Sequence, residues 1–124
     1  MLTREIIFDL LTANGKQPQY AKGFSTIIEN NTDGTAYYIL EYNGNARVGW
    51  GLYEGPLKYL KSFPKSAIIL INSQTADGAG EMFFILDAVH FVNALKGNVS
   101  PYMVDRQDVA TRGVSYENFE DYLS

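Results

Sequence analysis

One short apolar run constrains the fold of this chain more than any other feature. Ala67 to Asn72 (AIILIN) is apolar almost without interruption, which is typical of a strand that is buried on both faces. The polar loop Ser73 to Gly80 separates it from a second run of this kind, Met82 to Leu86. The sequence therefore predicts two strands inside the core of the protein.

Three segments have the spacing of helices. In the first, residues 3 to 13, apolar side chains recur at helical intervals after Thr3, which can cap the helix. The second predicted helix is Glu54 to Phe63, with Pro56 in its first turn. Asp87 is expected to cap a third helix, which ends at a Lys-Gly pair.

Three β-rich runs lie between the first two helices, and they are Phe24 to Asn30, Ala36 to Tyr42 and Ala46 to Leu52. Asp33-Gly34 and Asn43-Gly44 separate the runs. Both dipeptides favour the positive φ angles of two-residue hairpin turns. We therefore expect an antiparallel, three-stranded meander.

Two-residue turns would also set the register of this meander. They place Ile28, Ile39 and Val48 in one apolar row, with Tyr37 opposite Trp50 beside it. We expect the first helix to pack on the face that carries this row. The same core is expected to contain Ile69, Leu70, Phe84 and Leu86.

The order of the elements predicts a mixed α/β fold in one globular domain, residues 1 to 124. A helix and the meander come first, and a helix, a buried strand, a further strand and a helix follow. A chain of this length can bury a core without disulfides or metals. It has no cysteine, which excludes a disulfide scaffold, a cysteine-ligated zinc or iron-sulfur site, and a cysteine nucleophile.

The sequence predicts neither export nor a membrane span. Asp9 interrupts the apolar stretch near the amino terminus, and no small-residue cleavage site follows it. No run approaches the roughly 18 consecutive apolar residues that a spanning helix needs. We therefore expect a cytoplasmic protein without a membrane partner.

Charge is distributed unevenly along the chain. Residues 1 to 66 contain seven basic and six acidic side chains, whereas residues 67 to 124 contain three and eight. The acidic half is either a solvated surface or a docking face for a basic protein partner. Aromatic side chains anchor protein interfaces, and the chain has nine tyrosines. The candidate partner-binding residues are Tyr116, Glu117, Glu120 and Asp121.

Lys58, Lys61 and Lys65 fall on one helical face, with Trp50 nearby in the sequence. Lysines can hold phosphates and an aromatic ring can stack on a base, so these residues are a candidate nucleic-acid site. The alternative is a solvated helix surface. The net charge of −4 gives no long-range attraction to a polyanion.

Three carboxylates form a candidate catalytic site. Glu29, Asp33 and Glu41 lie on adjacent predicted strands or on the turn between them. Metal-dependent phosphodiester hydrolysis needs two or three acidic groups around Mg²⁺ and a cation near the attacking water. Mg²⁺ is therefore the one cofactor expected for a nuclease, and none is expected for a binding protein. The predicted register also places Glu29 within reach of Arg47 for a surface ion pair, which would add little stability. Glu41 is either a metal ligand in a cleft or lies at a solvated end of the sheet.

Two stretches of the second half carry a family resemblance. MFFILDAVHFVNAL (Met82 to Leu95) is an aromatic strand that runs into a helix led by Asp-Ala, and PYMVDRQDVATRG (Pro101 to Gly113) is a short strand with an acidic segment. With the order of the elements, they resemble the PD-(D/E)XK nuclease superfamily and the later half of its RecU-type Holliday-junction resolvases. The resemblance implies a nuclease-like fold with an Asp in one strand and E-x-K in the next. Glu41 matches the Glu of that motif, but Asn43 replaces the Lys and cannot supply its positive charge.

Two classes of function remain. The incomplete catalytic set and the low basic charge favour a small, acidic, non-catalytic protein that inhibits or regulates a protein partner, on a nuclease-like fold or another. The alternative is a nucleic-acid-binding or metal-dependent nuclease-like domain of the PD-(D/E)XK type. We expect no enzymatic activity unless that alternative holds, in which case the protein is a Mg²⁺-dependent phosphodiesterase.

Overall fold

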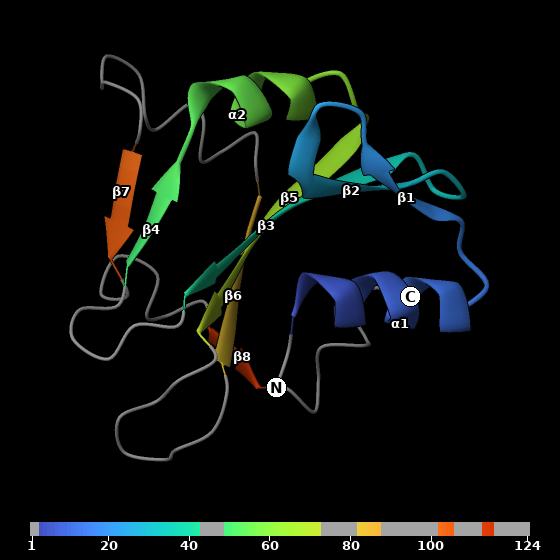
Figure 1. Cartoon of the computed structure of the whole chain (residues 1–124), viewed down its shortest axis with the longest axis horizontal. Coiled ribbons are helices and arrows are strands. Elements are labelled where there is room, and N and C mark those ends of the chain that lie inside the picture. The colour runs from blue at the N-terminus through green and yellow to red at the C-terminus, as the bar shows by residue number, and fades with distance from the viewer. Residues whose placement is uncertain (1–2, 43–48, 73–81, 88–101, 106–112, 116–124) are drawn as a thin grey trace.

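A mixed β-sheet with one helix on each face forms the centre of the protein in the computed structural model (Figure 1). The structure describes residues 3–42, 49–72, 82–87, 102–105 and 113–115. The predicted α/β fold class is confirmed. The elements are α1 (Arg4–Ala13), β1 (Pro18–Ala21), β2 (Phe24–Asn30), β3 (Thr35–Tyr42), β4 (Gly49–Leu52), α2 (Glu54–Leu60), β5 (Lys65–Asn72), β6 (Met82–Asp87), β7 (Tyr102–Asp105) and β8 (Gly113–Ser115).

The large sheet has six strands in the order β1-β2-β3-β5-β6-β8. β3 and β5 are parallel, and every other neighbouring pair in this sheet is antiparallel. A parallel pair needs a long crossover connection, and the chain between β3 and β5 contains α2. β4 and β7 form a separate two-stranded sheet.

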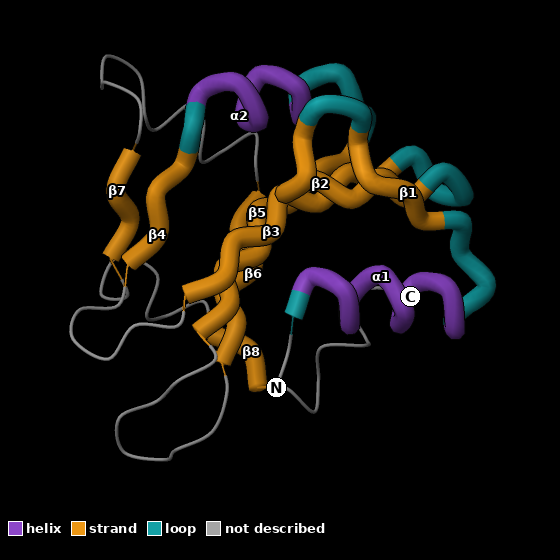
Figure 2. Tube along the Cα trace, viewed as in Figure 1, coloured by secondary structure: helices purple, strands orange, loops and turns teal. Residues whose placement is uncertain are grey.

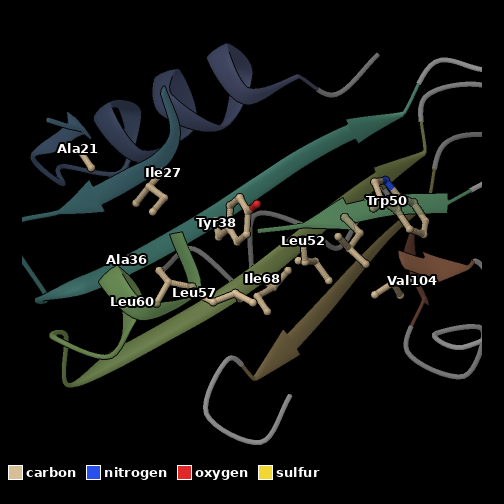
Figure 3. Packing of buried hydrophobic residues seen from close by; sticks show 11 residues of the cluster. Ala21, Ile27, Ala36, Tyr38, Trp50, Leu52, Leu57, Leu60, Ile68 and Val104 are labelled. Carbon is tan, nitrogen blue, oxygen red and sulfur yellow. The ribbon is translucent and has the colours of Figure 1, made fainter. Parts of the chain in front are cut away.

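The two faces of the sheet carry two hydrophobic clusters. Ile7 and Leu11 of α1 pack on one face. Leu57 and Leu60 of α2 pack on the other, in the cluster that Figure 3 shows. Successive residues of a strand point to opposite faces, so β3 and β5 contribute to both clusters. The predicted burial of the Ala67–Asn72 run on both faces is confirmed for residues 68–71, which are at most 1% exposed.

The first helix begins and ends as predicted. The Thr3 hydroxyl accepts a hydrogen bond from the Ile6 N–H at 3.2 Å, and Gly15 takes the positive φ of 77° that allows the chain to turn away. α2 ends at Leu60, three residues before the predicted end at Phe63. The N–H of Phe63 bonds to the carbonyl of Leu60, which is a tighter turn than the α-helix makes, and Pro64 follows.

The predicted register of the first hairpin is wrong by two residues. Ile28 pairs with Tyr37 instead of Ile39, and a four-residue loop, Asn31 to Gly34, replaces the two-residue turn. The cause is the Asn30 side chain, which accepts the Thr32 N–H at 3.1 Å and stabilises the wider loop. A shift of two residues keeps each side chain on its face. Ile28 and Ile39 are therefore both fully buried under α1, as predicted.

The predicted pairing of the second hairpin is also wrong. β3 has β5 as its neighbour, and β4 pairs with β7. Tyr37 consequently lies in the α1 cluster and Trp50 in the α2 cluster, so the two are not opposite each other. Two of the four β4 residues are glycines, which pack poorly, whereas β5 fills both faces with large side chains. Val48 and the Asn43-Gly44 turn lie outside the described residues.

The second predicted core strand is present as β6, which pairs antiparallel with β5. The side chains of Phe84 and Leu86 lie outside the described part, as does the predicted helix after Asp87, the last residue of β6. Leu70 belongs to the α2 cluster, whereas Ile69 packs with Ile28 and Ile39 as predicted. Neither α1 nor α2, the helices of the described residues, is long and apolar enough to cross a membrane.

Candidate binding cleft

The three predicted catalytic carboxylates occupy separate positions. Glu29 is on the α2 side of the sheet and is only 7% exposed. Its carboxylate accepts hydrogen bonds from the Tyr59 hydroxyl of α2 and from the Gln19 amide of β1, the latter at 2.6 Å. This bond and the nearby negative charge raise the pKa of the Tyr59 hydroxyl, because ionisation would bring two negative charges together. Glu29 therefore joins β1, β2 and α2.

Asp33 lies in the loop between β2 and β3. Its carboxylate is 2.9 Å from the Lys16 ammonium and accepts a hydrogen bond from the Asn30 amide. The bond to Lys16 is the main cause of a lowered pKa of the Asp33 carboxyl. Asp33 thus stabilises the loop that sets the register of the hairpin.

Glu41 lies on the α1 side of the sheet, near the end of β3. Its carboxylate accepts the backbone N–H of Arg4, the first residue of α1, at 2.6 Å. A negative charge is stabilising at a helix amino terminus. Glu29 and Glu41 therefore face opposite sides of the sheet, and no three acidic or histidine side chains converge on a metal site within the described ranges.

The predicted nucleic-acid site is only partly retained. Lys58, Lys61 and Lys65 are all exposed, and Lys58 forms an ion pair of 3.1 Å with Glu54. Trp50 is 3% exposed, and its indole N–H donates to the carbonyl of Ile71 at 3.1 Å. Its ring fills the α2 cluster and is not available to stack on a base, which corrects the expectation for this residue. The predicted partner-binding residues, Tyr116, Glu117, Glu120 and Asp121, lie outside the described residues, as does Arg47.

β2 and β3 separate at one end of their length. Their pairing runs from Asn30 only as far as Ile27, and Phe24 pairs with Ala21 of β1 instead. In Figure 2, β2 bends away from β3 as it runs to the turn with β1. Beyond Ile27, the Arg4 guanidinium takes the place of a neighbouring strand. It donates two hydrogen bonds to the Ile39 carbonyl, at 3.2 and 2.9 Å. The sequence pattern did not predict this role, because Arg4 appears there only on the polar side of a helix.

An open cleft of about 870 Å³ lies at this separation. Residues from α1, β1, β2 and β3 and from the turn after β1 line it, and they are Thr3, Arg4, Glu5, Tyr20, Ala21, Gly23, Phe24, Ser25 and Glu41. Both charged and aromatic side chains are present in this set. The cleft can therefore form ion pairs, hydrogen bonds and aromatic contacts with a ligand.

Tyr20 is the exposed aromatic residue of the cleft. It is 42% exposed, and its ring stacks on Phe8 of α1 with ring centroids 5.0 Å apart and planes inclined by 10°. Burial is the largest cause of its raised pKa, and the charges of Glu5, Asp9 and Glu41 raise it further. Tyr20 thus presents a neutral ring that is held by stacking, in a cleft that Glu5 and Glu41 also line.

Sequence reasoning missed Tyr20 because the segment Pro18–Ala21 has no clear strand pattern and contains a proline. Proline is nevertheless tolerated in edge strands, and β1 is an edge strand. Only its pairing with β2 indicates that Tyr20 lies beside α1. Comparisons of the chain with protein-family models, with curated proteins and with solved structures gave no match.

Proposed function

We propose that this is a small, acidic, non-catalytic binding protein that inhibits or regulates a protein partner, and that the cleft beside Tyr20 is its binding site. The observation that carries the proposal is the separation of the three candidate catalytic carboxylates. Glu29, Asp33 and Glu41 each stabilise a different part of the fold, through α2, Lys16 and α1 respectively. A cytoplasmic location belongs to the same proposal.

The geometry of Tyr20 supports a role in binding. Tyrosines are frequent anchors of protein interfaces because one ring supplies a large contact area with few rotatable bonds. Stacking on Phe8 already restricts the ring, so less conformational entropy is lost when a partner binds. The protein has a second exposed tyrosine, Tyr53, which is 55% exposed and does not line the cleft. Tyr53 therefore provides a matched control.

The test is capture of partners from the native host with the immobilised protein, followed by calorimetry with each purified partner. We expect one protein to bind the wild type and the Tyr53→Ser variant equally and to bind the Tyr20→Ser variant at least about tenfold more weakly, as for an interface hot spot. Circular dichroism and a thermal melt would verify that both variants are folded. The proposal is wrong if Tyr20→Ser and Tyr53→Ser bind every partner like the wild type, or if the protein cleaves DNA with Mg²⁺.

Exposed cations favour one second candidate, a nucleic-acid-binding or metal-dependent nuclease-like domain. Lys58, Lys61 and Lys65 are exposed at the end of α2 and the start of β5, where a phosphate backbone could contact them. The resemblance to the PD-(D/E)XK superfamily supports the same candidate. Mg²⁺ would be its cofactor. The loss of Trp50 as a stacking residue and the separation of the carboxylates make it the weaker proposal.

A further inference from the structure

We propose that the cleft binds a cationic side chain, Lys or Arg, in a basic segment of the protein partner, with the Tyr20 ring as its platform. This inference rests on the proposed function and adds the chemistry of the ligand. Cations are attracted to the face of an aromatic ring, most strongly when carboxylates stand nearby. Tyr20 combines these features, since Phe8 stacks on one face of its ring and Glu5 and Glu41 line the same cleft.

The charges around Tyr20 are not balanced. Glu5 and Glu41 line the cleft with Tyr20, and among the described residues Arg4 is the one basic side chain in its wall. Within the described residues, the side chains of Glu5 and Asp9 have no hydrogen bond or ion pair, and one carboxylate oxygen of Glu41 bonds to the Arg4 N–H. Two carboxylates against one guanidinium in the wall of the cleft leave one negative charge that a basic ligand can neutralise.

The Arg4 guanidinium keeps its charge, but its hydrogen bonds go to the sheet and not to a carboxylate of the described residues. Two of its N–H groups donate to the Ile39 carbonyl, where the neighbouring strand is missing. The guanidinium is thereby held against the sheet, and its backbone N–H fixes the Glu41 carboxylate at the rim of the cleft. The fold thus holds the Glu41 carboxylate in the wall of the cleft through the amino terminus of α1.

The size of the cleft favours a peptide segment over a lone small cation. About 870 Å³ lies near the upper end of the range of roughly 300 to 1,000 Å³ for ligand sites. A single Lys or Arg side chain occupies a small part of that space. The remaining wall includes the apolar Ala21 and Phe24 and the Ser25 hydroxyl, which suit the residues on either side of the cation.

The experiment uses the intact protein and three probe peptides of the same length, in which glycine alternates with arginine, with lysine or with uncharged citrulline. Amide chemical shifts of the isotope-labelled protein report the site and give the affinity. We expect both cationic peptides to shift the amides of residues 4–5 and 20–25, and the citrulline peptide to leave them unchanged. Equal binding of the citrulline peptide would overturn the inference.

Four variants distinguish the contribution of the Tyr20 ring to binding from that of the carboxylates. Tyr20→Phe keeps the ring and should bind like the wild type, whereas Tyr20→Leu should weaken binding by about twofold to fivefold, the range for an exposed cation–π contact. Glu5→Gln should weaken it by a similar factor, and more at low salt. Glu54→Gln on α2 is the control for charge alone and should have no effect. Equal affinities of Tyr20→Phe and Tyr20→Leu would refute the role of the Tyr20 ring as a platform for the cation.

The captured partner distinguishes failure of this inference from failure of the proposed function. If a partner binds the wild type but is insensitive to Tyr20→Leu and Glu5→Gln, the protein is a binding protein whose cleft does not recognise a cation, and the inference is wrong. If no partner binds and DNA is cleaved with Mg²⁺, the proposed function itself is wrong. We expect a partner whose affinity falls with both substitutions and falls further when the lysines or arginines of its bound segment are replaced.

Discussion

The hydrogen bond between Tyr59 and Glu29 gives the most direct test of how α2 is held on the sheet. Tyr59→Phe removes only the hydroxyl and leaves the ring in place between Phe24 and Phe63. The carboxylate then remains buried, at 7% exposure, with the Gln19 amide as its one hydrogen-bond donor in the described structure. Hydrogen bonds to charged groups contribute about 1.5 to 3 kcal/mol, so we expect a loss of that size in the free energy of unfolding.

The same substitution changes the alkaline part of the stability curve. The pKa of Tyr59 is raised in the folded state, so its hydroxyl adds stability below the unfolded pKa of about 10 and loses it as the pH rises through the folded pKa. Tyr37 and Tyr38, whose pKa values are raised mainly by burial, act in the same direction. We therefore expect the wild type to lose stability above about pH 10, and Tyr59→Phe to lose less over that range.

Urea unfolding followed by circular dichroism, at pH 7 and at several values from pH 9 to 11, measures both effects. Tyr53→Phe is the control, because Tyr53 is 55% exposed and its hydroxyl has no hydrogen bond among the described residues. The control should change stability by less than about 0.5 kcal/mol. Wild-type stability of Tyr59→Phe at pH 7, with an unchanged alkaline slope, would show that Glu29 does not hold α2 through this hydroxyl.

Three further predictions concern the core, the metal and the lysines. Ile39→Ala should reduce the free energy of unfolding by about 2 to 5 kcal/mol because it leaves a cavity under α1, and an unchanged urea midpoint would reject its burial. Mg²⁺ or Mn²⁺ should not raise the melting temperature, and a rise that Glu41→Gln abolishes would favour the nuclease. Replacing Lys58, Lys61 and Lys65 with Ser should leave the affinity for a protein partner unchanged. If the protein binds DNA, the same replacement should flatten the salt dependence by about two to three units.

The sequence predicted those elements that depend on neighbouring residues. Thr3 and Gly15 mark the ends of α1, and the bounds of β2 agree with the predicted run. Caps, turn residues and apolar periodicity act over a few positions, so they are visible in the sequence. Burial of β5 on both faces was predictable for the same reason, because it needs only a continuous apolar run.

The errors concern contacts between distant segments. The register of the first hairpin depends on one side chain, Asn30, which stabilises a longer loop than Asp33-Gly34 alone would favour. The neighbour of β3 depends on a competition between β4, which follows it in the chain, and β5, which arrives after α2. β5 buries large side chains on both faces of the sheet, which favours it over β4 as the neighbour of β3. The residues of β3 themselves give no indication of this preference.

The site was harder to predict than the fold, because its residues come together through contacts between distant segments, and these are the contacts that the sequence did not predict. Glu41 was singled out from the sequence, but its partner Arg4 is 37 positions away and reaches it because β2 separates from β3 beyond Ile27. The predicted meander pairs β2 with β3 along their length, so it does not indicate the separation at which the cleft lies. Glu29 and Glu41 are apart because their side chains face opposite sides of the sheet, whereas the cleft lies where β2 leaves β3.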